Sequence, residues 1–220
     1  MPLPRTRVLP GTLRELADFE ALIRAVPAGA WDTPSRCAGW TVGDVCRHLT
    51  GTIAAIAAGN FDDLVGPDAT ARQVAQRQGM TAEQVADELR DATKVAADIT
   101  AAIDDTAWDG PPPVDVPGTM GFAVEAIWYD AYMHGDDVRA ALGRDSVRGD
   151  GLAAAVSHVT DALRQREWGP ARVALDGFDP VIFGTGGPTV AGDPLAFVLV
   201  ATGRVDPSTL GLDGTVNIYA

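Results

Sequence analysis

Apolar residues recur every three to four positions through most of the first 143 residues, a spacing typical of amphipathic helices. Helix starts are indicated where a threonine precedes such a run and an acid or amide follows three residues later, at Thr12, Thr41 and Thr81. The pattern predicts helices from Thr12 to before Pro27, from Thr41 to near Gly59, from Thr81 to Ile103, and from about Gly118 to Leu142. Four long amphipathic helices predict a helix bundle.

The segments between these helices are rich in residues that favour turns. We expect a loop over Trp31–Trp40, and the longer connection Phe61–Met80 has room for a short helix around Ala71–Arg77. Trp108–Pro113 ends in consecutive prolines, which lack backbone N–H donors. A rigid, non-helical connector is therefore predicted there.

The pattern changes after Asp150. A fifth helix is expected from Leu152 to about Arg166, and Asp193-Pro194 is typical of the start of an apolar helix through Ala201. Gly184–Pro188 is expected to form a turn, and three segments have strand-like composition: Val173–Leu175, Val181–Phe183 and Thr215–Tyr219. We therefore predict an α-helical bundle plus α+β, with a four-helix bundle domain over residues 1–150 and a smaller α+β C-terminal domain over residues 151–220.

Composition narrows the classes of function. The 220-residue chain has a net charge of −13, which repels nucleic-acid phosphates and anionic lipid headgroups, so neither nucleic acid nor membrane is expected as a partner. No apolar stretch reaches the roughly 20 residues of a transmembrane helix, and the N-terminus lacks a secretory signal, so a cytoplasmic protein is expected. Cys37 and Cys46 lack the spacing of a redox or zinc motif and are expected to be reduced. The single lysine, Lys94, argues against lysine-based catalysis.

The histidines carry the candidate chemistry. At about 100° per residue, His48 lies on the flank of the apolar stripe of its helix, and Asp130 and His134 share the flank of another. One interpretation is a metal site that takes three nitrogen and oxygen ligands from two helices and leaves a position open for water or substrate. The other is a surface Asp–His pair with an unrelated interfacial histidine, because this four-residue spacing is common by chance.

Other conspicuous residues have structural interpretations. Cys46 is expected to be a buried small hydrophobe, and His158 to be structural or exposed. Asp137 follows His134 by one turn and is in position to orient that imidazole, but we expect a solvated carboxylate. Three tryptophans are expected to anchor the core and the loops: Trp31, Trp40 and Trp128.

Three parts of the chain, spread over nearly its full length, follow a known pattern. They are Trp31–Leu49, which contains W-T-V-G-D-V-C-R-H-L, then Asp130–Gly143, and finally Val190–Leu195 with Gly203–Asp206. Together they resemble the mycothiol-dependent maleylpyruvate isomerase family, whose members are DinB-like metal-binding bundles. The resemblance therefore implies a DinB-like four-helix bundle with a small C-terminal domain.

The resemblance also implies roles for particular residues. His48, Asp130 and His134 match the positions that hold a divalent metal, expected to be zinc, although the family more often has glutamate where Asp130 stands. Arg204 matches an arginine that binds anionic substrate, and the other interpretation is a helix C-terminal arginine that complements the helix dipole.

The family's activity implies a metal-dependent enzyme that uses the small thiol mycothiol as cofactor or co-substrate. It would be an isomerase or a thiol S-transferase acting on an electrophilic or carboxylate substrate. Two other functions remain open at the same site: a non-catalytic metal- or small-molecule-binding bundle, which the aspartate at position 130 favours, and metal-assisted hydrolysis. Arginine far outnumbers lysine, which is consistent with a GC-rich actinobacterial source and with mycothiol as the thiol.

Overall fold

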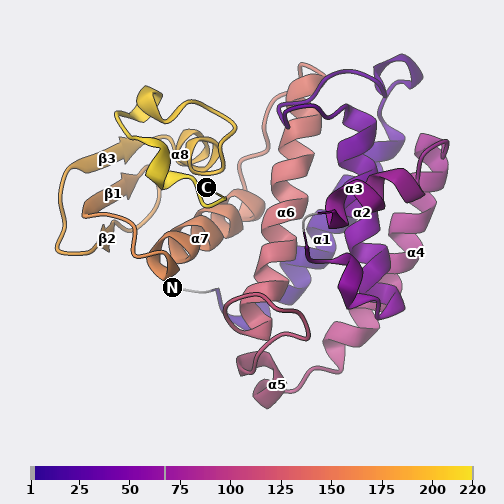
Figure 1. Ribbon diagram of the computed structural model, residues 1–220, viewed down its shortest axis with the longest axis horizontal. Coiled ribbons are helices and arrows are strands. Elements are labelled where there is room, and N and C mark those ends of the chain that lie inside the picture. The colour runs from indigo at the N-terminus through magenta and orange to yellow at the C-terminus, as the bar shows by residue number, and fades with distance from the viewer. Residues whose placement is uncertain (1–2, 67, 220) are drawn as a thin grey trace. The chain divides into compact units, whose positions relative to one another are not determined.

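The computed structural model describes residues 3–66 and 68–219 (Figure 1). The chain divides into two compact units, one formed by Pro4–Gly151 and the other mainly by the residues from Leu152 onward. The described part of the first unit is helical, and the second combines helices with a small sheet. The predicted class, an α-helical bundle plus α+β, is confirmed.

Four long helices form the first unit: α1 (Arg5–Arg24), α2 (Val42–Ala58), α4 (Ala82–Ala101) and α6 (Met120–Ala141). α1 and α2 each pack against both α4 and α6. Their apolar faces meet in one core, which includes Leu16, Phe19, Ile23, Val45, Leu49, Ile53, Leu89 and Val138. The predicted four-helix bundle is therefore present.

The limits of α2 follow from its sequence. Thr41 Oγ1 accepts a hydrogen bond from Asp44 N at 3.2 Å, and Asp44 Oδ2 accepts one from Thr41 N at 3.1 Å, so the predicted capping box is formed. Thr81 starts α4 with a capping box of the same kind. α2 ends at Gly59, which has a φ of 66°. These caps place His48 in the second turn of α2.

The helix start predicted at Thr12 is wrong. α1 begins at Arg5 and contains Pro10, and Thr12 is buried with its hydroxyl donating to Val8 O at 2.8 Å. The Thr12–Glu15 spacing matched a capping box, but it lies inside the helix, and Pro10 costs that helix one backbone hydrogen bond without ending it. Val8 is fully buried, and this packing holds the first turns helical.

The connections between the long helices are partly structured. The short helix expected around Ala71–Arg77 is present as α3 (Ala69–Gln76), and single 3-10 turns occur at η1 (Ala28–Ala30) and η2 (Phe61–Asp63). The non-helical connector over Trp108–Pro113 is only partly correct, because α5 (Asp105–Asp109) includes Trp108. The side chain of Asp104 caps this short helix by accepting from Ala107 N at 2.8 Å, and the prolines follow after it ends.

The second unit begins with α7 (Asp150–Gln165), whose first residues precede the division between the units. A three-stranded sheet follows, formed by β1 (Ala171–Leu175), β2 (Val181–Phe183) and β3 (Thr189–Gly192) in the order β2-β1-β3. β1 pairs antiparallel with β2 and parallel with β3. Helix α8 (Pro194–Ala201) starts as predicted, with the Asp193 side chain accepting from Leu195 N at 3.0 Å.

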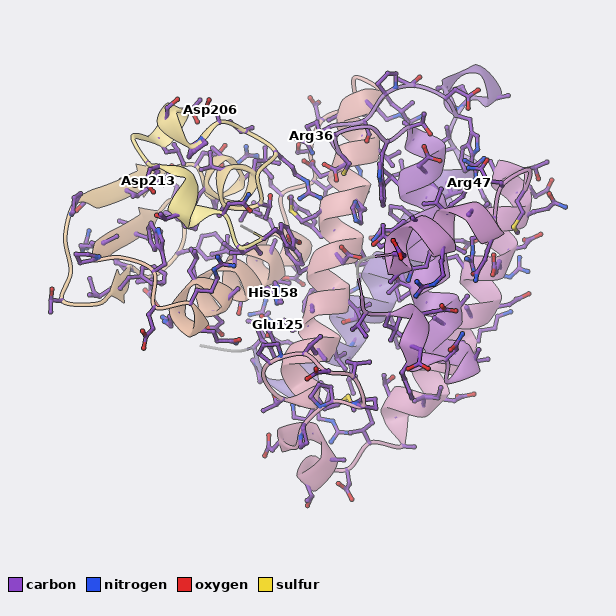
Figure 2. The ribbon with its side chains drawn as sticks, in the orientation of Figure 1. Arg36, Arg47, Glu125, His158, Asp206 and Asp213 are labelled. Carbon is purple, nitrogen blue, oxygen red and sulfur yellow. The ribbon has the colours of Figure 1, made fainter. Side chains whose placement is uncertain are left out.

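Two details of the second unit differ from the prediction. The strand expected at Thr215–Tyr219 is absent, and the chain forms a 3-10 turn, η4 (Gly214–Val216), because the Asp213 side chain (labelled in Figure 2) accepts from Thr215 N at 3.0 Å. The third strand is instead β3, which four residues form directly after the predicted turn. Four residues are too few to show a clear alternation of apolar and polar positions, and the pairing of this segment with β1 decides its conformation.

Candidate metal centre

Helices α2 and α6 bring three potential metal ligands together. Nε2 of His134 lies 3.3 Å from Asp130 Oδ1, and Nε2 of His48 lies 3.8 Å from Asp130 Oδ2. The two imidazole rings are 5.1 Å apart and perpendicular, and one ligand atom from each residue lies within 4.8 Å of the others. Asp130 and His134 meet because they are one helical turn apart, whereas His48 reaches them through the packing of α2 on α6.

A buried glutamine fixes the orientation of His48. Nδ1 of His48 lies 2.7 Å from Gln73 Oε1, and the Gln73 amide donates through Nε2 to Asp63 O at 2.8 Å, which sets the direction of the amide. Because Oε1 only accepts, Nδ1 of His48 carries the proton and Nε2 keeps its lone pair toward Asp130. Gln73 belongs to α3, and no sequence motif marks it as part of the site.

A buried carboxylate holds His134 in the same way. Nδ1 of His134 lies 3.2 Å from Oδ2 of Asp137, whose other oxygen lies 3.2 Å from Arg36 Nη2. Asp137 is fully buried, so the expectation of a solvated carboxylate is wrong. The loop that carries Arg36 covers this part of α6, and the helical periodicity gave no sign of that cover.

The electrostatic environment differs between the two imidazoles. Burial lowers the pKa of His48, and the Asp130 carboxylate only partly offsets this effect. Burial also disfavours a charged His134, but the charge of Asp130 and the hydrogen bonds to Asp130 and Asp137 raise the pKa of His134 well above its usual value. His48 is therefore ready to act as a neutral ligand, whereas a cation at His134 must compete with a proton.

Trp40 adds an aromatic wall beside the two imidazoles. Its ring centroid lies 5.2 Å from that of His48 in an edge-to-face contact and 6.4 Å from that of His134 in a stacked contact. Trp40 and Trp31 also pack against the bundle core, and Trp128 is buried, which confirms the predicted anchoring role of the three tryptophans.

The structure also gives the local surroundings of the remaining candidates. Cys46 is fully buried in the core as predicted, and burial raises the pKa of its thiol. His158 is a buried residue of α7, so its structural interpretation is the correct one. Arg204 follows α8 and is half-buried, with its backbone N donating to Leu199 O at 2.9 Å at the end of that helix. Cys37 is the residue that the sequence undervalued, because its Sγ lies 3.2 Å from Asp137 Oδ2.

Comparison with known proteins places this chain in a family. Residues 12–139 match the model of the mycothiol maleylpyruvate isomerase N-terminal domain. Two crystal structures of a mycothiol-dependent maleylpyruvate isomerase, one of them a histidine-to-alanine mutant, superpose with TM-scores of 0.70 and 0.71. Each shares 13% identity, and the match covers 96% of this chain and 95% of the other, so the likeness shows a common DinB-like fold.

Two further comparisons bear on the class of protein. No protein of curated function has a sequence that matches this chain. Among the helices of the described residues, none combines the length and the apolar character that crossing a bilayer requires. The family match spans more than half of the chain and includes all three residues of the His48, Asp130 and His134 cluster. The chain therefore belongs to the family defined by the mycothiol maleylpyruvate isomerase N-terminal domain.

Proposed function

We propose that this protein is a metal-dependent enzyme that uses a small thiol, mycothiol, as cofactor or co-substrate. The reaction would be isomerisation or thiol S-transfer of the maleylpyruvate isomerase type. The observation that carries the proposal is the convergence of His48, Asp130 and His134, with the Nε2 atoms of both rings directed at the same carboxylate. Family membership and the shared fold support the proposal.

The donor set fits a divalent metal. Two imidazole nitrogens and one carboxylate oxygen are the ligands of many catalytic zinc sites, which keep a further position open. Each Nδ1 has an acceptor, Gln73 for His48 and Asp137 for His134, as is usual for metal-bound histidines. A bound ion would supply positive charge that favours the thiolate form of a thiol at the open position. Asp130 offers the same hard oxygen as the more usual glutamate, from a side chain one methylene shorter.

The protein's own residues would hold and orient these groups. Gln73 and Asp137 would keep the lone pairs of the two rings directed at the centre, and Trp40 packs beside both rings. Arg204 is proposed to bind a carboxylate of the substrate, on the basis of its match to the family pattern. A guanidinium suits that task because it donates two parallel hydrogen bonds.

Elemental analysis with activity assays tests the proposal. Wild-type protein should contain about one equivalent of metal, a His134→Ala variant should lose it, and a Cys46→Ala variant, altered in α2 outside the cluster, should keep it. Turnover of maleyl-type and other electrophilic substrates should require both metal and thiol when mycothiol, glutathione, cysteine and no thiol are compared. Equal rates of turnover with and without thiol would reject thiol transfer and favour metal-assisted hydrolysis. Absence of both metal and turnover would favour a binding module.

A further inference from the structure

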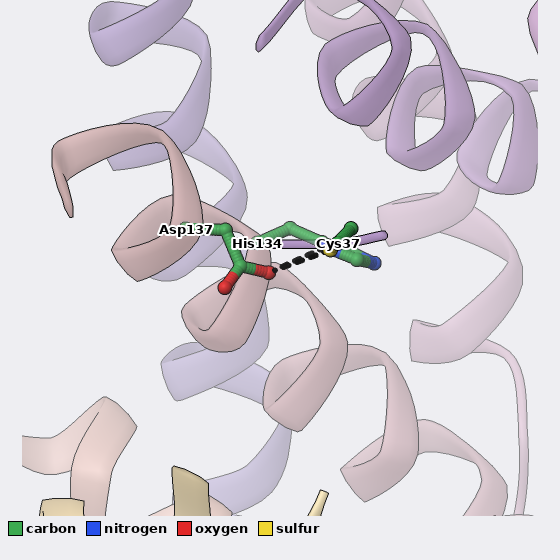
Figure 3. Close-up of side chains that lie close together, drawn as sticks. All are labelled: Cys37, His134 and Asp137. Carbon is green, nitrogen blue, oxygen red and sulfur yellow. Dashed lines mark hydrogen bonds and ion pairs between the residues drawn. The ribbon is translucent and has the colours of Figure 1, made fainter. Parts of the chain in front are cut away.

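A second cluster of potential ligands lies on the other side of the His134 ring. It consists of Cys37 from the loop before α2 and of Asp137 and His134 from α6 (Figure 3). Cys37 Sγ and His134 Nδ1 each lie 3.2 Å from the same oxygen, Asp137 Oδ2, and they are 4.0 Å from each other. One nitrogen, one oxygen and one sulfur therefore form a compact triangle.

The size of this triangle suits a metal ion. Tetrahedral zinc with bonds of about 2.0–2.3 Å places neighbouring ligand atoms about 3.4–3.6 Å apart. The three observed separations, 3.2, 3.2 and 4.0 Å, lie on either side of that range. Small side-chain rotations would equalise them. The sulfur ligand also distinguishes this cluster chemically from the one that contains His48, because thiolate favours soft and borderline ions.

The loop that carries Cys37 is held in place by its own hydrogen bonds. Ser35 N donates to Trp40 O at 2.8 Å, Trp40 N donates to Cys37 O at 2.9 Å, and Cys37 N donates to Ser35 Oγ at 3.1 Å. Cys37 is only partly buried, so an ion has a route to its sulfur. The ligand is therefore preorganised and accessible, as a metal site requires.

The charges around the cluster favour a cation. Asp136 and Asp137 are both fully buried, and Nη2 of Arg36 contacts both of them, at 2.5 and 3.2 Å. Oδ1 of Asp136 is buried and has no hydrogen-bond partner among the described residues. Two buried carboxylates thus lie beside the cluster and share the guanidinium of Arg36, and both attract a cation at short range. Arg36 contacts Oδ1 of Asp137, whereas Oδ2 lies next to Cys37 Sγ and His134 Nδ1.

We propose that Cys37, Asp137 and Nδ1 of His134 form a second metal subsite, selective for thiophilic divalent ions such as Zn²⁺, Co²⁺ and Cd²⁺. The thiol proton of Cys37 and the proton on Nδ1 of His134 both leave to solvent when the ion binds. A neutral imidazole has one lone pair, so His134 serves either this subsite through Nδ1 or the His48 cluster through Nε2. The two subsites therefore compete for His134, and removal of His48 favours the one that contains Cys37.

Cobalt titration of three purified variants tests this proposal. The His48→Ala variant should develop the near-ultraviolet thiolate-to-cobalt charge-transfer band. Adding Cys37→Ala should abolish that band, whereas adding Cys46→Ala should leave it, because Cys46 lies in the core and outside the cluster. Far-ultraviolet circular dichroism establishes that each variant is folded. Absence of the band in folded His48→Ala protein, or its persistence after Cys37→Ala, would overturn the proposal and leave Cys37 as a hydrogen-bond donor to Asp137.

A second measurement needs no substitution at Cys37. In the His48→Ala variant, Zn²⁺ should slow alkylation of Cys37 by iodoacetamide, and EDTA should restore the rate. An unchanged rate at saturating Zn²⁺ contradicts the proposal even if the Cys37→Ala variant does not fold. Because these experiments use protein without His48, their outcome is independent of whether the wild-type protein binds metal at the His48 cluster or turns over a thiol.

Discussion

Replacing Gln73 with leucine should weaken metal binding without unfolding the bundle. Gln73 is 3% exposed, and its Oε1 is 2.7 Å from His48 Nδ1, so Gln73→Leu keeps an apolar stem of similar size but removes the acceptor. The ring can then turn or change tautomer, and its lone pair is no longer held toward Asp130. Loss of such an outer partner typically weakens metal affinity about 10- to 100-fold, or about 1.4–2.7 kcal/mol.

The same substitution also affects the metal-free protein, and the two effects can be separated. A buried N–H left without an acceptor costs about 1–3 kcal/mol, so the free energy of unfolding should fall by a similar amount. Urea denaturation measures this loss, and competition with a chromophoric zinc chelator measures affinity. Ring ¹⁵N chemical shifts report the tautomer of His48 directly.

The matched control is Gln76→Leu, which changes the same residue type on the exposed side of α3. It should leave zinc affinity and the His48 ring shifts unchanged. If Gln73→Leu binds zinc as tightly as the wild type, or if Gln76→Leu weakens binding equally, Gln73 does not orient His48 and the reasoning from the 2.7 Å contact is refuted.

Three further predictions concern stability and substrate binding. Because the pKa of His134 is raised in the folded state, protonated His134 stabilises the metal-free protein fully below about pH 6.5, and this stabilisation is lost as the pH rises through the folded-state pKa. The free energy of unfolding in urea, measured at pH 6.5 and 8.5, should therefore lose this pH-dependent component in the His134→Gln variant. An unchanged pH dependence in the variant would contradict the prediction. Gly11→Ala should destabilise the bundle by about 1–3 kcal/mol despite the better helix propensity of alanine, because the new Cβ would lie 2.2–2.5 Å from atoms of the Trp128 ring. Thermal denaturation measures this loss, and a raised melting temperature would show that the Trp128 ring moves aside at no cost. Arg204→Ala should raise KM for a carboxylate substrate about 10- to 150-fold, the equivalent of about 1.5–3 kcal/mol, and should leave the metal content unchanged. An unaltered KM in steady-state assays would show that Arg204 does not bind substrate and only complements the dipole at the end of α8.

The sequence predicts the bundle well because its helices are defined by local rules. The 3.6-residue periodicity and the capping boxes at Thr41 and Thr81 depend only on residues close together in the sequence, so they can be recognised without knowledge of the fold. Thr12 misled because burial of Val8, a tertiary effect, extends α1 past Pro10 toward the N-terminus. β3 escaped prediction for the same reason, since four residues become a strand only by pairing with β1.

In the candidate metal centre too, local features can be predicted from the sequence, whereas features that depend on tertiary packing cannot. The adjacency of Asp130 and His134 follows from the geometry of one helix, and spacing alone predicts it. That His48 meets them depends on how α2 packs against α6; the position of His48 on the flank of its helix left this as one of two interpretations, and the family resemblance favoured it. The roles of Gln73 and Cys37 depend on how α3 and the loop before α2 lie against the long helices, and the spacing of residues in the sequence marks neither of them as part of the site.

The partners of the polar side chains of α6 show how one bundle accommodates so many of them. His134, Asp136 and Asp137 are buried within about one turn of α6, a helix that also contributes to the core, and burial of unpaired charge would destabilise this helix. Their partners, Arg36 and Cys37, come from the loop before α2, and the partner of His48 comes from α3. The apolar faces of the long helices are thereby left free to form the core. The long helices thus supply both the fold and the candidate ligands, whereas the connecting segments orient those ligands, so a substitution in a connecting segment can alter the site without disturbing the packing of the bundle.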